Sequence, residues 1–115
     1  MQINLFKNKQ LSFNERCYEL LKLIPEGKVT TYKAIANALN TQAYQAVGNA
    51  MANNPTPISV PCHRVVKSNG ELGEFALGVA KKVSLLEKEG VMVNNHKIMN
   101  FFDCYYDFSE YLDEK

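Results

Sequence analysis

The chain has 115 residues, with 13 lysines and arginines against 12 aspartates and glutamates, 46% hydrophobic residues and three cysteines. This length predicts one domain that buries roughly two-thirds of the surface of its unfolded chain, which excludes a multidomain enzyme. No stretch approaches the ~18 consecutive apolar residues of a membrane span, and the N-terminus lacks an apolar signal-peptide core. We expect a soluble monomer without a membrane partner, located in the cytoplasm, or in the nucleus of a eukaryote.

Charge is distributed unevenly along the chain. Residues 1–100 carry 12 basic and 7 acidic side chains, whereas residues 101–115 carry 1 basic and 5 acidic. We therefore expect a mildly basic body over 1–100 and an acidic C-terminal segment over 101–115. A basic body of this kind is compatible with a nucleic-acid partner and equally with an ordinary solvated surface.

The first half of the chain carries the signals of three helices. Ser12 and Glu15 have the spacing of a capping box, before a helix that we expect to end at Pro25. Thr31 is expected to cap a second helix, and Asn40-Thr41 to stop it and cap a third. Two short helices joined by a tight turn are typical of a helix-turn-helix.

The third helix, predicted from Gln42 to about Asn53, is unusual for the small residues on its surface. Tyr44, Val47 and Met51 are predicted to face the core, while the remaining positions include Ala43, Ala46, Gly48 and Ala50. Small side chains allow close approach, either of a neighbouring helix or of a nucleic-acid groove. The pattern alone leaves both interpretations open.

The second half predicts an extended apolar segment, a helix, a hairpin and a final helix. The segments are Ile58–Val66, about Gly78–Glu89, and strands at Val91–Val93 and Lys97–Met99 around Asn94-Asn95. Phe101, Tyr105, Phe108 and Leu112 have the spacing of one helical face, which predicts an amphipathic C-terminal helix that docks on the body or binds a partner. The overall prediction is one α+β domain, mainly helical and winged-helix-turn-helix-like, with short strands.

Cys62 is the cysteine whose neighbours suit chemistry. Cysteine reacts as the thiolate, so a reactive cysteine needs a base or a positive environment, which His63 and Arg64 are placed to supply. A Cys-His dipeptide is weak evidence by itself, because an isolated thiol is commonly a packing group. The cysteines and histidines have neither C-x-x-C nor H-x-x-x-H spacing, so we expect no metal site.

The hexapeptide Pro61-Cys62-His63-Arg64-Val65-Val66, preceded by Asn54-Pro55 and by Ala46-Val47-Gly48-x-Ala50-Met51, resembles the active-site segment of a known family. This is the O6-alkylguanine-DNA alkyltransferase, or methylated-DNA--protein-cysteine methyltransferase, family. The likeness runs from about Gly27 to Gly90 and corresponds to the C-terminal catalytic and DNA-binding domain. It implies DNA repair without a cofactor: the helix-turn-helix binds the minor groove of double-stranded DNA, the alkylated guanine flips out, and its alkyl group passes irreversibly to the cysteine.

The resemblance also implies a role for each matching residue. Cys62 would accept the alkyl group, with His63 drawing off its proton through a water and Glu89 orienting and charging that histidine. Tyr32 would protonate the departing guanine, and Asn54 would hold the active-site turn. The implied DNA-binding residues are Thr31, Tyr32, Ala43, Gln45, Ala46, Gly48 and Arg64, and the implied pocket residues are Val60, Pro61, Phe75 and Ala76. Arg64 is also expected to pair inside the fold.

The sequence departs from the family in its pocket and its organisation. Phe75 and Ala76 occupy positions where a tyrosine and a serine are common, so a hydrogen bond to the guanine oxygen is expected to be missing. Family members commonly carry an N-terminal α/β domain for which this chain has no counterpart, and we expect the aromatic tail to cover the surface that this domain would cover.

Two other functions remain open. One is that of the alkyltransferase-like proteins, which recognise alkylated DNA without repairing it and have tryptophan or another residue in place of the nucleophile. The other is a thiol protein unrelated to DNA. The presence of Cys62, His63, Glu89 and Tyr32 favours alkyl transfer.

Gln45 stands where the family's recognition helix normally has an arginine that enters the base stack, and glutamine lacks its charge. We expect the Gln45→Arg variant to bind alkylated duplex DNA more tightly, or to react with it faster, than the wild-type protein. Binding and single-turnover rates measured side by side check this prediction. A variant with no gain in either quantity contradicts it.

Overall fold

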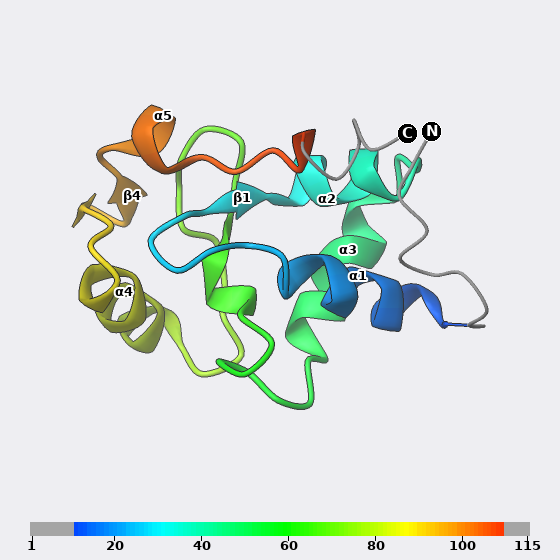
Figure 1. The fold of residues 1–115 in the computed structure, drawn as a ribbon. Coiled ribbons are helices and arrows are strands. Elements are labelled where there is room, and N and C mark those ends of the chain that lie inside the picture. Colours follow the sequence, from blue (N-terminus) through cyan, green and yellow to red (C-terminus); the bar gives the residue numbers. More distant parts are fainter. Residues whose placement is uncertain (1–10, 110–115) are drawn as a thin grey trace.

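The computed structural model describes residues 11–109, and it confirms an α+β domain in which helices predominate. In chain order the elements are α1 (Phe13–Leu21), β1 (Thr30–Thr31), α2 (Tyr32–Ala38), α3 (Tyr44–Ala52), the 3₁₀-helix η1 (Cys62–Arg64), β2 (Val65–Val66), α4 (Val79–Lys88), β3 (Val93–Asn94), β4 (Lys97–Ile98) and α5 (Phe101–Cys104). Figure 1 shows α1, α2 and α3 at one end of the domain and α4, β4 and α5 at the other. Within the described part of the chain, no helix is long and apolar enough to cross a bilayer.

A two-stranded parallel sheet joins these two halves. β1 pairs with β2 in the register Thr30–Val65 and Thr31–Val66. Val65 packs in a hydrophobic cluster with residues of the first three helices, whereas Val66 packs in a second cluster with residues of α4 and the C-terminal hairpin. Because successive strand residues point to opposite faces, this one strand contributes to both cores.

The predicted caps of the first two helices are confirmed. The Ser12 hydroxyl accepts a hydrogen bond from the Glu15 amide at 3.1 Å, and the Glu15 carboxylate accepts one from the Ser12 amide at 2.8 Å. The Thr31 hydroxyl accepts one from the Ala34 amide at 2.9 Å, so the residue that ends β1 also begins α2. Cys17 is fully buried in the first cluster, as its place on the apolar stripe of α1 predicts.

The prediction that α1 extends to Pro25 is wrong, because the helix ends at Leu21. The Leu23 and Ile24 amides donate to carbonyls three residues earlier, at 3.0 and 3.1 Å, and so tighten the chain into a 3₁₀-like turn. This turn buries Ile24, which is 2% exposed. The early end of the helix therefore places one more apolar residue in the core.

Helix α3 is shorter than predicted, and its buried residues differ from those predicted. Thr41 does not cap it: the Thr41 hydroxyl accepts from the Ala43 amide within the preceding turn, and the helix begins at Tyr44 without a side-chain cap. Tyr44, predicted to be a core residue, is 43% exposed, and Ala50 is buried instead. Because Ala50 is small, its carbonyl accepts a hydrogen bond from the Tyr18 hydroxyl of α1 at 2.8 Å.

The extended segment predicted over Ile58–Val66 is also corrected. Only Val65 and Val66 form a strand, and the three residues before them form the 3₁₀-helix η1. The C-terminal hairpin is confirmed: its strands are β3 and β4, and Asn95 and His96 form its two-residue turn. Both turn residues have positive φ, at 52° and 60°, which is typical of the turn that best matches strand twist.

The predicted amphipathic C-terminal helix is wrong beyond its first turn. α5 ends at Cys104, and the chain then runs beside Val29: the Val29 amide donates to the Cys104 carbonyl at 2.8 Å, and the Tyr106 amide donates to the Val29 carbonyl at 2.7 Å. This pairing extends the β1 edge and competes with helical hydrogen bonding. Leu112, the last residue of the predicted face, lies outside the described residues.

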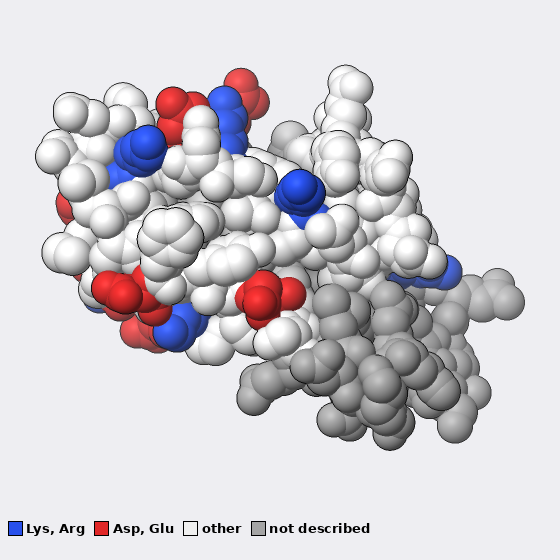
Figure 2. All heavy atoms as spheres, turned by 90° about the horizontal axis from the view of Figure 1, so that it is seen from above, with Lys and Arg blue, Asp and Glu red and all other residues white. Residues whose placement is uncertain are grey.

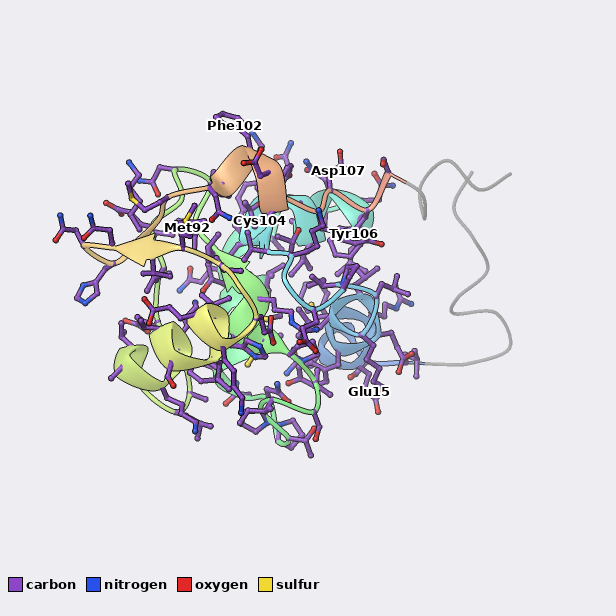
Figure 3. All side chains as sticks on the ribbon, turned by 60° about the vertical axis from the view of Figure 1, so that its left-hand side comes forward. Glu15, Met92, Phe102, Cys104, Tyr106 and Asp107 are labelled. Carbon is purple, nitrogen blue, oxygen red and sulfur yellow. The ribbon has the colours of Figure 1, made fainter. Side chains whose placement is uncertain are left out.

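The aromatic side chains of this segment have opposite environments. Phe108 is fully buried in the first cluster, whereas Phe102 is 94% exposed and points away from the domain in Figure 3. Figure 2 shows the face that carries the tail, where scattered charges of both signs lie among uncharged atoms. The segment thus contributes Phe108 to the core formed with the first three helices, and the half-buried Tyr106 packs against the same cluster.

We expect the Phe108→Ala variant to lose about 3–5 kcal/mol of unfolding free energy, because truncation leaves a cavity in the first cluster. Urea denaturation measures the loss. Phe102→Ala is the matched control, and it should change stability by less than about 0.5 kcal/mol. Equal effects of the two substitutions would contradict the packing described for this segment.

Candidate active site

The Cys62 side chain lies on the wall of a cavity of about 580 Å³ between α3 and the loop that precedes α4. Cys62 begins η1, directly after Pro61, and its side chain is almost wholly buried. Other predicted site residues that line the same cavity are Tyr32, Gln45, Gly48, Phe75 and Ala76. The fold therefore places the thiol, α3 and the predicted pocket loop around one cavity.

His63 and Arg64 point away from that hollow toward Glu89, at the C-terminal end of α4. The His63 Nε2 atom lies 2.9 Å from Glu89 Oε2. Arg64 donates from Nη2 to Oε2 at 2.8 Å and from Nε to Oε1 at 3.0 Å, and its Nη1 donates to the Ile24 carbonyl. The Gly27 amide donates to Oε1 at 3.3 Å. One carboxylate thus receives donors from two segments of the chain, η1 and the turn before β1.

These contacts set the protonation states of the network. Burial raises the pKa of the Glu89 carboxyl, but the donors from Arg64 and His63 outweigh burial and hold the pKa below its ordinary value. Burial lowers the pKa of His63 below 6.5, despite the opposing effect of Glu89. At neutral pH the pair is therefore a carboxylate and a neutral imidazole.

The second ring nitrogen of His63 is the notable atom of this group. Nδ1 is buried and has no hydrogen-bond partner among residues 11–109. When Nε2 donates its proton to the ionised Glu89, Nδ1 carries the free lone pair and can accept a proton. His63 directly follows Cys62 in η1, so the candidate base and the candidate nucleophile are consecutive residues of the chain.

Cys62 is a protonated thiol at rest rather than a stable thiolate. Burial raises its pKa, while hydrogen bonding with the Asn54 side chain and the charge of Lys82 partly offset this effect. Arg64, expected from the sequence to provide a positive environment, is instead engaged by Glu89. Reaction at Cys62 therefore needs a base that removes the proton as the bond forms.

The Asn54 side chain stabilises the turn that precedes Cys62 through two hydrogen bonds. Its side-chain amide donates to the Val60 carbonyl at 2.8 Å, and its carbonyl oxygen accepts from the Thr56 amide at 3.0 Å. The Cys62 amide donates to the same Val60 carbonyl at 2.7 Å. Val60 and Pro61, predicted to be pocket residues, do not line the cavity, because they are buried and act through the backbone.

Tyr32 lines the cavity from the first residue of α2. Burial raises its pKa to about 12, with further increases from Cys62 and Glu74, so the phenol keeps its proton at neutral pH. Gly73 lies against it: a Cβ at this position, where φ is +72°, would lie 3.1 Å from the Tyr32 hydroxyl. Glycine at this position thus leaves the hydroxyl room beside the cavity.

Several residues of the predicted DNA-binding set lie on the surface of α3 or just before it. Ala43 and Gln45 are exposed, and Ala46 and Gly48 are half-buried. Apart from the chain neighbours of Gly48 and its own helix backbone, no atom of residues 11–109 lies within 4 Å of the position that a Gly48 Cβ would occupy, so this part of α3 is open to close approach. In contrast, the side chains of two other members, Thr31 and Arg64, are engaged in a helix cap and in the Glu89 ion pair.

Lys82 is the residue of this site that sequence reasoning missed. Its side chain is fully buried, and its ammonium donates to the carbonyls of Val65 at 2.7 Å, Leu72, and Glu74 at 3.1 Å. It therefore ties β2, which follows the reactive turn, to the loop that forms the cavity wall. The available signal was a lysine between Val79 and Leu86 on the predicted apolar stripe of α4. Burial lowers the pKa of Lys82 to about 8.

We expect Lys82→Met to lower the unfolding free energy by about 1–3 kcal/mol, because buried carbonyls lose their donor. Loss of the cation should also raise the pKa of Cys62, since a nearby positive charge favours the thiolate. Iodoacetamide labelling of Cys62, followed by peptide mass spectrometry across pH, measures this shift. Lys81→Met, at an exposed position of the same helix, is the control, and identical pH profiles for the two variants would contradict the assignment.

No group of three or more histidine, cysteine, aspartate or glutamate side chains within residues 11–109 is placed to hold a metal ion. The polar groups that converge on the reactive turn are instead those of the histidine, arginine and glutamate network.

Comparison with known proteins matches residues 12–91 to the family model described as 6-O-methylguanine DNA methyltransferase, DNA binding domain. A methylated-DNA--protein-cysteine methyltransferase from Thermococcus gammatolerans is 51% identical over 80 residues, which cover 69% of this chain and 45% of that protein. The human methylated-DNA--protein-cysteine methyltransferase is 45% identical over 84 residues, covering 71% of this chain and 41% of that protein. The chain thus spans less than half the length of these two curated relatives.

Solved structures give the same assignment. The O6-methylguanine-DNA methyltransferase of Pyrococcus kodakaraensis has a TM-score of 0.65 and 49% identity, covering 70% of this chain and 47% of that chain. The S. pombe protein Atl1, in complex with damaged DNA containing O6-carboxymethylguanine, has a TM-score of 0.73 and 26% identity, covering 92% of this chain and 98% of that one. The family match covers more than half of the chain, from the cap of α1 past Glu89. The chain therefore belongs to the 6-O-methylguanine DNA methyltransferase family, and residues 12–91 correspond to the DNA-binding domain of that family.

Proposed function

We propose that this chain repairs O6-alkylguanine in double-stranded DNA by transferring the alkyl group irreversibly to its own Cys62. The observation that carries the proposal is the buried thiol on the wall of a cavity beside α3, next to a neutral histidine held by a carboxylate. Curated relatives named methylated-DNA--protein-cysteine methyltransferase, and a related structure of a Mycobacterium tuberculosis protein in complex with DNA, support it.

Access to the damaged base follows from the position of α3. A base inside duplex DNA is stacked and paired, so its O6 substituent reaches a thiol only when the nucleotide is extruded. The small residues Ala46 and Gly48 let this helix approach a minor groove closely, and Gln45 lies at the rim of the cavity that would receive the base. Phe75 offers an apolar ring surface within the cavity, against which a base can stack.

Four side chains take part in the proposed alkyl transfer. The Cys62 proton passes through a water to His63 Nδ1, and the sulfur attacks the alkyl carbon as the bond from that carbon to O6 breaks. Glu89 stabilises the imidazolium that forms. Tyr32 gives its proton to the departing guanine and recovers one through solvent from His63. In net terms the thiol loses one proton, guanine gains one, and Tyr32 and His63 return to their resting states. The product is a stable thioether, so each molecule reacts once.

Recognition of a lesion without repair is the second candidate function. It is favoured by one observation: the structural match with Atl1 extends over 92% of this chain and 98% of that one. The arrangement of Cys62, His63 and Glu89 supports the repair function over this alternative, because a binding module has no need of a base beside a thiol. The two functions make opposite predictions for covalent transfer.

We expect intact-protein mass spectrometry to detect one methyl adduct per chain after incubation with a duplex that contains O6-methylguanine. Cys62→Ser should form no adduct while still binding the duplex. Glu89→Gln should react about 100-fold more slowly, because His63 loses the charge that stabilises its protonated form. Lys88→Gln, at the neighbouring exposed position, is the matched control and should react like the wild-type protein.

The outcomes separate the two candidate functions. An adduct that depends on Cys62 establishes repair by transfer. Binding of the modified duplex with no adduct would assign the chain to lesion recognition and contradict the proposal. An adduct on Cys17 or Cys104, located by peptide mapping, would contradict the assignment of the nucleophile.

A further inference from the structure

The reactive cavity has charges of its own, because one carboxylate and one ammonium group belong to its lining. Among the described residues that line it, Glu74 and Lys67 are the charged ones. Glu74 belongs to the connection between β2 and α4, and Lys67 directly follows β2. Neither side chain forms an ion pair with a charged group of residues 11–109. Each charge is therefore available to a molecule that enters the cavity.

The chain neighbours of Glu74 lie beside groups that take part in the proposed transfer. Gly73, which precedes it, lies against the Tyr32 hydroxyl, since a Cβ on this glycine would be 3.1 Å from that oxygen. Phe75, which follows it, has its ring edge-to-face with the His63 ring, with the centroids 6.3 Å apart. Both neighbours also line the cavity. Glu74 is thus held between a residue beside the proposed acid and a residue beside the proposed base.

The Glu74 charge acts on this part of the cavity without a cation to offset it. Burial, Cys62 and the Glu74 carboxylate raise the pKa of Tyr32 to about 12. Lys67 is not among the charges that act on this phenol. The buried Lys82 ammonium lies outside the cavity lining and donates to three backbone carbonyls, one of them that of Glu74. The side of the cavity near Tyr32 is therefore negatively charged.

We propose that Glu74 is a specificity-determining residue that selects uncharged alkyl groups over anionic ones at O6 of the extruded guanine. The inference rests on the proposed function, because the substituent must enter the cavity that Cys62 lines. An anionic substituent such as carboxymethyl would bring a second carboxylate close to Glu74, and like charges repel. DNA that covers the cavity excludes water, which strengthens this repulsion. An uncharged substituent meets no such barrier.

The experiment compares two duplexes whose O6 substituents have nearly the same shape and differ in charge. One carries carboxymethyl, an anion at neutral pH, and the other carries carbamoylmethyl, the uncharged amide of that acid. Equilibrium binding is measured in a Cys62→Ser background, and the rate of alkyl transfer is measured with Cys62 intact. We expect both quantities to favour the amide by about fivefold at low salt, and by less at high salt, because ions screen the repulsion.

Glu74→Gln should reduce this preference to about twofold or less, mainly by improving binding and transfer of the carboxymethyl lesion. Glu71→Gln is the matched control, because Glu71 is an exposed carboxylate of the same connection that does not line the cavity. This control should keep the wild-type preference. The ratio between the two lesions removes any general effect of a substitution on folding or on Tyr32.

Equal preferences in the Glu74→Gln variant and in the Glu71→Gln control overturn the proposal. So does a wild-type protein that fails to distinguish the two lesions. A wild-type protein that favours the carboxymethyl lesion also overturns it, since Lys67 would then set the charge of the cavity. Because binding is measured without transfer, the expected preference in binding with no transfer at Cys62 would support the selection by Glu74 and contradict only the proposed function.

Discussion

The Glu89 carboxylate is the group on which the arrangement of this domain depends. A largely desolvated carboxylate is tolerated only when it is paired and hydrogen-bonded, and the half-buried Glu89 receives donors from His63, Arg64 and Gly27. Arg64 continues the connection to the Ile24 carbonyl at the end of the α1 turn. The end of α4, the reactive turn and the turn before β1 are thereby joined at one point.

The same carboxylate links architecture with chemistry. Since Arg64 and His63 both donate to Glu89, its charge is satisfied, and His63 can remain a neutral base with Nδ1 unengaged. Burial that lowers the pKa of His63 also raises the pKa of Cys62, so the thiol keeps its proton until a substrate arrives. In the proposed reaction, proton removal accompanies attack on the alkyl carbon, so the resting thiol is protected from other electrophiles.

The sequence correctly predicted two helix caps and the hairpin, because these features are determined by interactions between residues close together in the chain. The caps at Ser12 and Thr31 and the turn of the hairpin each depend on residues within four positions of one another. The C-terminal helix failed because Val29, far away in sequence, offers strand hydrogen bonds to Cys104 and Tyr106. Lys82 was missed for a related reason: its three carbonyl partners come together only in the folded chain, and its own position on an apolar stripe gives no hint of them.

The tautomer of His63 is the most direct test of the account. Nitrogen-15 NMR at neutral pH distinguishes the two ring nitrogens, and a His96→Gln variant removes the signal of the exposed second histidine. The account predicts a neutral ring that carries its proton on Nε2, toward Glu89, and a bare Nδ1. A proton on Nδ1, or on both nitrogens at pH 7, would leave Cys62 without its base and contradict the account.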